Sequence, residues 1–111
     1  MSLDTASQDV VIFYTPEDTN LKNLLLSLLH RNGSKNLFKK IKTKEVDSTS
    51  DVLSINYKNK NVILGSKTYE LVKETTNITG HENIFVFNLS KEQEIFSNGY
   101  LNLIIKLLGD F

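Results

Sequence analysis

Two short apolar runs stand out along the chain, one near each end. They cover residues 10–14 (VVIFY) and 84–87 (IFVF), and polar residues interrupt neither of them. Uninterrupted runs of β-branched and aromatic residues are typical of strands that are buried on both faces. We therefore predict two central strands of one sheet.

An amphipathic helix follows the first run. Its apolar positions recur at helical spacing and match one helical face in full. They are Leu21, Leu24, Leu25, Leu28 and Leu29. Thr15 is the expected N-cap, Pro16 the expected first helical residue, and Asn32-Gly33 the expected stop.

A second helix follows the second run. Ser90 and Gln93 have the spacing of a capping box, and the helix that they open extends through residue 108. We expect residues 98–99 (NG) to kink or break it. Residues 101–108 are apolar on more than one face, so this helix either lies centrally across the sheet or packs against another subunit.

The middle of the chain has a weaker pattern. We expect one exposed strand over residues 38–46, and a hairpin whose strands are residues 52–57 and 62–64, joined by a polar turn. Ser66 is placed to cap a short helix that ends at Thr75.

These elements follow one another in the order β-α-β-β-β-α-β-α. The pattern predicts an α/β (mixed α+β) fold, a single domain over residues 9–111, with a flexible tail over residues 1–8. We expect a mixed sheet of about five strands with helices packed on it.

Composition excludes several classes of function. The chain has 111 residues, with 13 Lys+Arg, 13 Asp+Glu and no cysteine. Without cysteine there is no disulfide scaffold, thiol nucleophile or cysteine-ligated metal centre. A net charge of zero argues against a general binder of nucleic acid or acidic membranes. No targeting signal and no apolar run long enough to cross a bilayer are present, so we expect the cytoplasm, with the nucleus also open.

Two fragments invite comparison with known binding motifs. Residues 65–68 (GSKT) follow a predicted strand, but they lack the paired glycines of a phosphate-binding P-loop. Residues 13–16 (FYTP) lead from a strand into a helix, as in thioredoxin-like proteins, but they carry no thiol pair. We interpret both as strand-to-helix turns. If the protein binds a ligand, we expect the site near residues 15–17 or 65–67, because α/β sheets bind ligands at strand ends.

No catalytic or metal-binding constellation is evident. His30 is predicted in the last turn of the first helix, and His81 lies in a loop beside Glu82 with no identifiable nucleophile. Asp47 and Asp51 lack the further ligands that a metal site needs. We therefore predict no cofactor and no metal, and expect a protein that is not an enzyme.

Basic residues are concentrated in one segment. Residues 21–44 carry no acid, and alternation over residues 40–44 places three lysines on one face of a strand. We favour a guard against edge-to-edge aggregation. A docking surface for an acidic protein partner and binding of nucleic acid stay open.

The closing part of the chain resembles the proteasome assembly chaperone 4 family. The similar features are a helix with Leu71-Val72, the strand in residues 83–89 (NIFVFNL) and a polar-capped final helix. Residues 9–13 and the leucine-rich segment look like that family's earlier strand and following segment. The Lys-rich middle does not align, and no strand precedes Val10. The resemblance implies a non-enzymatic chaperone that pairs with a paralogous subunit and helps to order proteasome α-subunits.

Our leading hypothesis is a small protein-interaction subunit of a larger complex, without a membrane or nucleic-acid partner. The alternative is an α/β domain or enzyme that binds a small ligand or a phosphate at the carboxyl ends of its strands. The residues that we predict to contact a partner are Lys35, Lys39, Lys40, Lys42, Lys44, Leu103 and Leu107.

Overall fold

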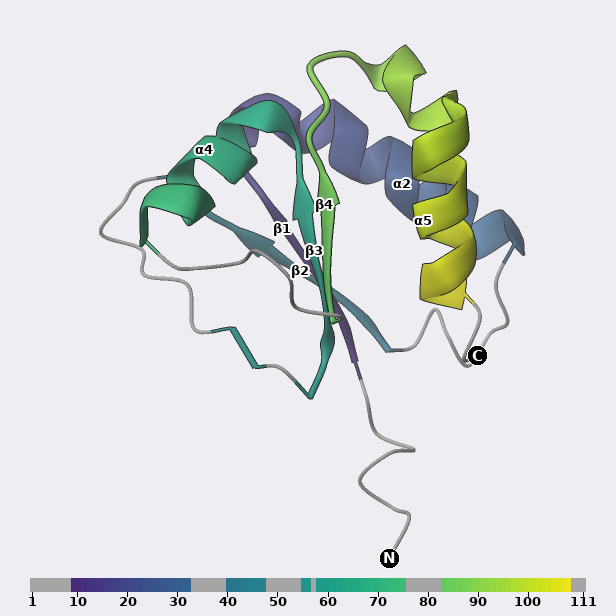
Figure 1. Ribbon diagram of the computed structural model, residues 1–111, viewed down its shortest axis with the longest axis horizontal. Helices are drawn as coiled ribbons and strands as arrows, with labels where there is room; N and C mark the ends of the chain where they lie inside the picture. The colour runs from purple at the N-terminus through teal and green to yellow at the C-terminus, as the bar shows by residue number, and fades with distance from the viewer. Residues whose placement is uncertain (1–8, 33–39, 48–54, 57, 76–82, 109–111) are drawn as a thin grey trace, which may run out of the picture.

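A parallel sheet of four strands forms the centre of the part of the chain that the structure describes (Figure 1). The computed structural model describes residues 9–32, 40–47, 55–56, 58–75 and 83–108. The strands lie in the order β2-β1-β3-β4, and each neighbouring pair is parallel. They are β1 (Val10–Tyr14), β2 (Ile41–Glu45), β3 (Lys60–Leu64) and β4 (Ile84–Phe87). The α/β class and the single domain are confirmed.

Helices cover both faces of this sheet. α2 (Thr19–Asn32) and α5 (Asn98–Leu108) pack on one face, and α4 (Ser66–Thr75) packs on the other. The short 3₁₀ helices η1 (Pro16–Asp18) and η2 (Glu92–Phe96) precede α2 and α5. The chain therefore leaves β1 toward one face and β3 toward the other. Between two neighbouring strands that diverge in this way, a doubly wound sheet has a crevice at its carboxyl edge.

The first strand and its helix agree with the pattern of apolar positions. β1 lies between two strands, and Leu21, Leu25 and Leu29 of α2 are buried in the core. Leu24 and Leu28 pack against the same core and are partly buried. The helix ends at Asn32, as expected. The N-cap differs, because the Thr15 side chain bonds the Asp18 carboxylate and not a backbone N–H.

The predicted hairpin is wrong. β3 pairs in parallel with β1 on one edge and with β4 on the other, so neither edge is open to an antiparallel neighbour. Residues 52–54 and 57 of the predicted partner strand lie outside the described residues. The sheet there is parallel rather than mixed, and it has four strands rather than about five.

Buried polar residues explain why the predicted strand began at Val62, whereas β3 begins two residues earlier, in the predicted turn. Lys60 and Asn61 begin this strand, and both are buried. The Asn61 amide donates to the backbone oxygens of Asn56 and Asn59 at 3.0 and 3.1 Å. The Lys60 ammonium donates to the backbone oxygen of Leu107 at 3.1 Å. Each buried polar side chain thus has a partner, and a polar sequence becomes part of a central strand.

The second apolar run forms β4, which lies at the edge of the described sheet and not at its centre. Its side chains alternate between the two cores, since Phe85 and Phe87 pack beneath α2 and α5 while Ile84 and Val86 pack on the α4 side. The apolar run therefore reflects burial of both faces, which does not require a neighbour on both edges.

The chain after β4 forms two helices instead of one. η2 ends at Phe96, Ser97 is extended, and α5 begins at Asn98, so the break falls one residue before the predicted Asn-Gly pair. The Glu94 carboxylate accepts the backbone N–H groups of Ser90 and Lys91 at 2.9 and 2.8 Å. Glu94, and not Gln93, therefore closes the cap.

Candidate functional site

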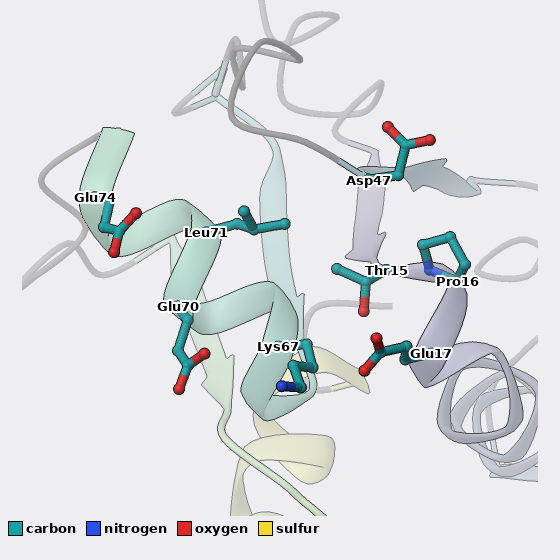
Figure 2. A pocket seen from close by; sticks show the side chains of 8 residues that line it. All are labelled: Thr15, Pro16, Glu17, Asp47, Lys67, Glu70, Leu71 and Glu74. Atoms are coloured by element: carbon teal, nitrogen blue, oxygen red, sulfur yellow. The ribbon is translucent and has the colours of Figure 1, made fainter.

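A hollow of about 380 Å³ opens at the carboxyl edge of the sheet, beside the point where the chain diverges after β1 and β3 (Figure 2). The turn after β1 forms one wall, and one side of α4 forms the opposite wall. We call this hollow the crevice. Its lining residues are Thr15, Pro16, Glu17, Asp47, Lys67, Glu70, Leu71 and Glu74. The two fragments singled out in the sequence, residues 13–16 and 65–68, therefore meet at one site.

A buried hydrogen-bonded cluster joins the two walls. The Thr15 hydroxyl donates to the Asp18 carboxylate at 2.8 Å, and the Thr68 hydroxyl donates to the same oxygen at 3.2 Å. The Thr68 hydroxyl also accepts the backbone N–H of Thr15 at 2.9 Å. All three side chains are buried. Because charged hydrogen bonds are among the stronger ones, this cluster fixes the end of β1 against the start of α4.

Gly65 makes room for that cluster. Its φ of 95° lies in the region that favours glycine. A Cβ at this position would also overlap the Asp18 carboxylate, whose most distant oxygen would be only 2.7 Å away. The turn and the close approach of Asp18 are therefore enough to require the glycine of the GSKT fragment.

The charged side chains around the crevice are mostly acidic. Glu70 and Glu74 lie on the same wall as Lys67, and Glu17 faces them from η1 (Figure 2). Asp47 adds a further carboxylate at the end of β2. One lysine among four carboxylates makes a poor site for a phosphate, because the surrounding field repels anions. The phosphate form of our alternative hypothesis is therefore disfavoured.

Of the His, Asp and Glu residues considered in the sequence as catalytic or metal-binding candidates, Asp47 is the one in the described ranges that lines the crevice. His30 lies in the last turn of α2 and is exposed, as expected, while His81, Glu82 and Asp51 fall outside the described residues. No group of three or more His, Asp or Glu residues in the described ranges could hold a metal ion.

The exposed apolar side chains lie elsewhere, on η2 and α5. Phe96, Leu101 and Ile105 are exposed to 53%, 37% and 64%, and they are the large exposed apolar residues of the described chain. Leu101 and Ile105 are four residues apart, so they are neighbours on one face of α5. We call these three residues the α5 apolar surface.

The two predicted contact residues on this helix lie on the face that is turned to the core. Leu107 is fully buried in the core, and Leu103 is partly buried against it. Leu107 is therefore not exposed to a partner, while Leu103 keeps part of its surface exposed, and its role as a contact stays a prediction. Both faces of α5 are apolar, and the core takes the one that contains Leu103 and Leu107.

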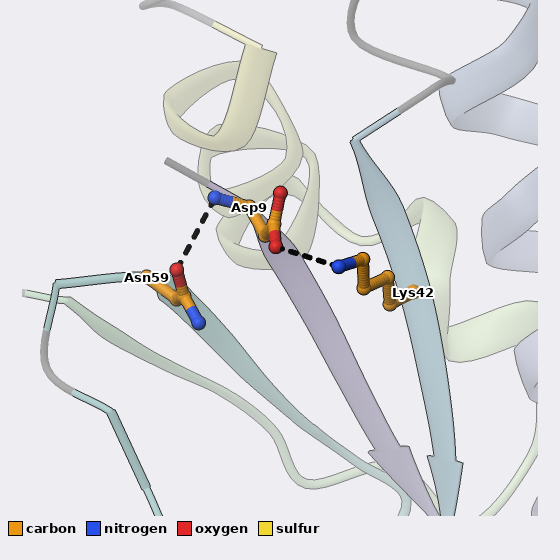
Figure 3. Close-up of polar contacts among 3 residues, drawn as sticks. All are labelled: Asp9, Lys42 and Asn59. Atoms are coloured by element: carbon orange, nitrogen blue, oxygen red, sulfur yellow. Dashed lines mark hydrogen bonds and ion pairs between the residues drawn. The ribbon is translucent and has the colours of Figure 1, made fainter. Parts of the chain in front are cut away.

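The predicted lysine surface lies on β2, an edge strand (Figure 1). Lys42 and Lys44 are exposed, and Lys40 immediately precedes the strand. The Lys42 ammonium pairs with the Asp9 carboxylate at 3.0 Å, and the Asp9 backbone N–H donates to the Asn59 side-chain oxygen at 3.2 Å (Figure 3). Lys35 and Lys39 lie outside the described residues. This placement supports the guard interpretation, because lysines on an edge strand oppose pairing with another sheet.

Sequence reasoning missed the buried residues Asp18, Thr68 and Lys60. Each is polar, and each looked like part of an exposed turn or helix end. Only their tertiary partners reveal their roles, and spacing along the chain does not give those partners.

Comparison of the chain with models of known protein families, with curated proteins and with solved structures found no match. No helix in the described ranges is long and apolar enough to span a membrane.

Proposed function

We propose that this protein is a non-enzymatic interaction subunit that binds a partner protein through the α5 apolar surface. The observation that carries the proposal is that Phe96, Leu101 and Ile105 are exposed on two consecutive elements, with Leu101 and Ile105 neighbours on one face of α5. The remaining large apolar residues of the described chain are buried or partly buried. Neighbouring exposed apolar side chains, such as Leu101 and Ile105, are typical of protein contact sites.

The location of this surface is suited to that role. α5 is held rigidly from its other side, where Ile104 and Leu107 enter the core and Tyr100 stacks on Phe87 at 5.8 Å between ring centroids. The Tyr100 hydroxyl also donates to the backbone oxygen of Asn88 at 3.1 Å. A partner would therefore meet a helix that is already ordered, and binding would cost little conformational entropy.

The resemblance to the proteasome assembly chaperone 4 family suggests the kind of partner. On that basis the partner is a paralogous small subunit, and the pair assists the assembly of proteasome α-subunits. A cytoplasmic or nuclear location belongs to the same proposal.

The test is a tagged pull-down from source lysate, followed by mass spectrometry. The wild-type chain is compared with Ile105→Asp and with Asn102→Asp, which adds the same charge at an exposed polar position of the same helix. We expect proteasome α-subunits and one small paralogue with the wild type and with N102D, and their loss with I105D. A chain that is strictly monomeric and captures no partner would refute the interaction role. Recovery of a different stable complex, also lost with I105D, would retain that role and discard the family.

A further inference from the structure

Two opposite charges without partners face the crevice. Glu17 belongs to η1 and Lys67 to the first turn of α4, so they come from opposite walls (Figure 2). Within the described residues, neither side chain makes a hydrogen bond or an ion pair. Both are exposed to solvent and thus accessible to a ligand.

Apolar side chains line the crevice beside these two charges. The Leu71 side chain, from α4, points into the crevice, and the Pro16 ring lies on the wall that carries Glu17 (Figure 2). Apolar contacts together with a few polar groups are what small-molecule sites offer, and a volume of about 380 Å³ is within their usual range. The crevice also lies where doubly wound sheets bind their ligands.

Hydrogen bonds fix the backbone beside each of the two charged residues. Each charged residue directly precedes a buried one in the sequence, Glu17 before Asp18 and Lys67 before Thr68. The Thr68 hydroxyl donates a hydrogen bond to the Asp18 carboxylate at 3.2 Å. The cluster of Thr15, Asp18 and Thr68 therefore sets the separation of the two walls before any ligand arrives. Such preorganisation is what a selective site requires.

We propose that the crevice binds a small zwitterion of the α-amino acid type with an apolar side chain. Its ammonium group pairs with the Glu17 carboxylate, its carboxylate pairs with the Lys67 ammonium, and its side chain lies against Leu71 and Pro16. The acids Asp47, Glu70 and Glu74 make the crevice negative overall, so a lone amine is tolerated better than a lone carboxylate.

The first experiment measures binding to the full-length chain by isothermal titration calorimetry with three related probes. They are leucine, isoamylamine (which lacks the carboxylate) and isocaproate (which lacks the amine). We expect leucine to bind about fivefold more tightly than isoamylamine, because an exposed charge pair contributes up to about fivefold in affinity. We expect isocaproate to bind most weakly, because the crevice is negative overall.

Two variants assign the two contacts. Glu17→Gln should remove the advantage of leucine over isocaproate, and Lys67→Met should remove its advantage over isoamylamine. The controls Glu45→Gln and Lys58→Met change the same charges at exposed positions outside the crevice and should leave all three affinities unchanged. Binding should also survive I105D, which separates this site from the α5 apolar surface.

Several results would overturn the proposal. Isoamylamine binding as tightly as leucine would show that the site recognises cations and not zwitterions. Retention of the leucine preference in both E17Q and K67M would place the binding elsewhere. Failure of leucine to bind at millimolar concentration would refute amino-acid binding in the crevice. That result would not affect the proposed role of the α5 apolar surface.

Discussion

Replacing Gly65 with alanine is the change that tests the architecture of the crevice most severely. The left-handed backbone at this position, with a φ of 95°, costs an alanine about 1–2 kcal/mol. The added Cβ also overlaps the Asp18 carboxylate, which must move away from the hydroxyl groups of Thr15 and Thr68. Loss of hydrogen bonds to a buried charged group costs a further 2–3 kcal/mol, as an order-of-magnitude estimate.

We therefore expect Gly65→Ala to lower the free energy of unfolding by about 3–5 kcal/mol, a large part of the total of about 5–15 kcal/mol for a domain. The assay is urea denaturation followed by circular dichroism. The matched control is Gly99→Ala in α5, where a Cβ would meet no atom within 4 Å. That change should be neutral or stabilise the helix by up to about 1 kcal/mol.

A double-mutant cycle separates the two causes. In an Asp18→Ala background the overlap disappears, so Gly65→Ala should then cost only the backbone term of about 1–2 kcal/mol. If G65A is within about 1 kcal/mol of wild type, or if the two substitutions are strictly additive, the close approach of Asp18 to Gly65 is refuted.

Three further predictions concern other parts of the molecule. Lys60→Met should destabilise the fold by about 1–3 kcal/mol, since the backbone oxygens of Lys106 and Leu107 lose their donor. Amide hydrogen exchange at the end of α5 should become faster for the same reason, and unchanged exchange there would contradict this prediction. Replacing Lys42 and Lys44 together with valine should leave unfolding nearly unchanged but raise light scattering with concentration, whereas valines at Lys58 and Lys91 should not. Tyr100→Phe should cost no more than about 1 kcal/mol, because only the hydroxyl bond to Asn88 is lost, and a much larger loss in thermal denaturation would show that this bond is misjudged.

The parts of the fold that were predicted from sequence are those where the local pattern and the tertiary structure agree. The leucines of α2 repeat at helical spacing, and the same positions enter the core. β1 is apolar throughout and lies between two strands. In both segments the pattern of apolar residues is enough to predict the element, because no buried polar residue interrupts that pattern.

The missed parts depend on contacts between distant residues. β3 begins with Lys60 and Asn61, whose burial is possible only because α5 and the preceding turn supply acceptors. The choice between the two apolar faces of α5 depends on its packing, and periodicity cannot decide it when both faces are apolar. The crevice could not be predicted without the order of the strands. Residues 13–16 and 65–68 lie next to each other only because β3 pairs with β1.

The α5 apolar surface is the central element of the proposed function, and the affinity of the purified partner is its most direct measure. Burial of an isoleucine side chain contributes about 1.5–3 kcal/mol, so a charge at Ile105 should weaken binding at least about tenfold. We predict that loss for I105D by calorimetry, together with an unchanged dissociation constant for N102D. Equal affinities for the wild type, I105D and N102D would contradict the account and place the interface elsewhere on the molecule.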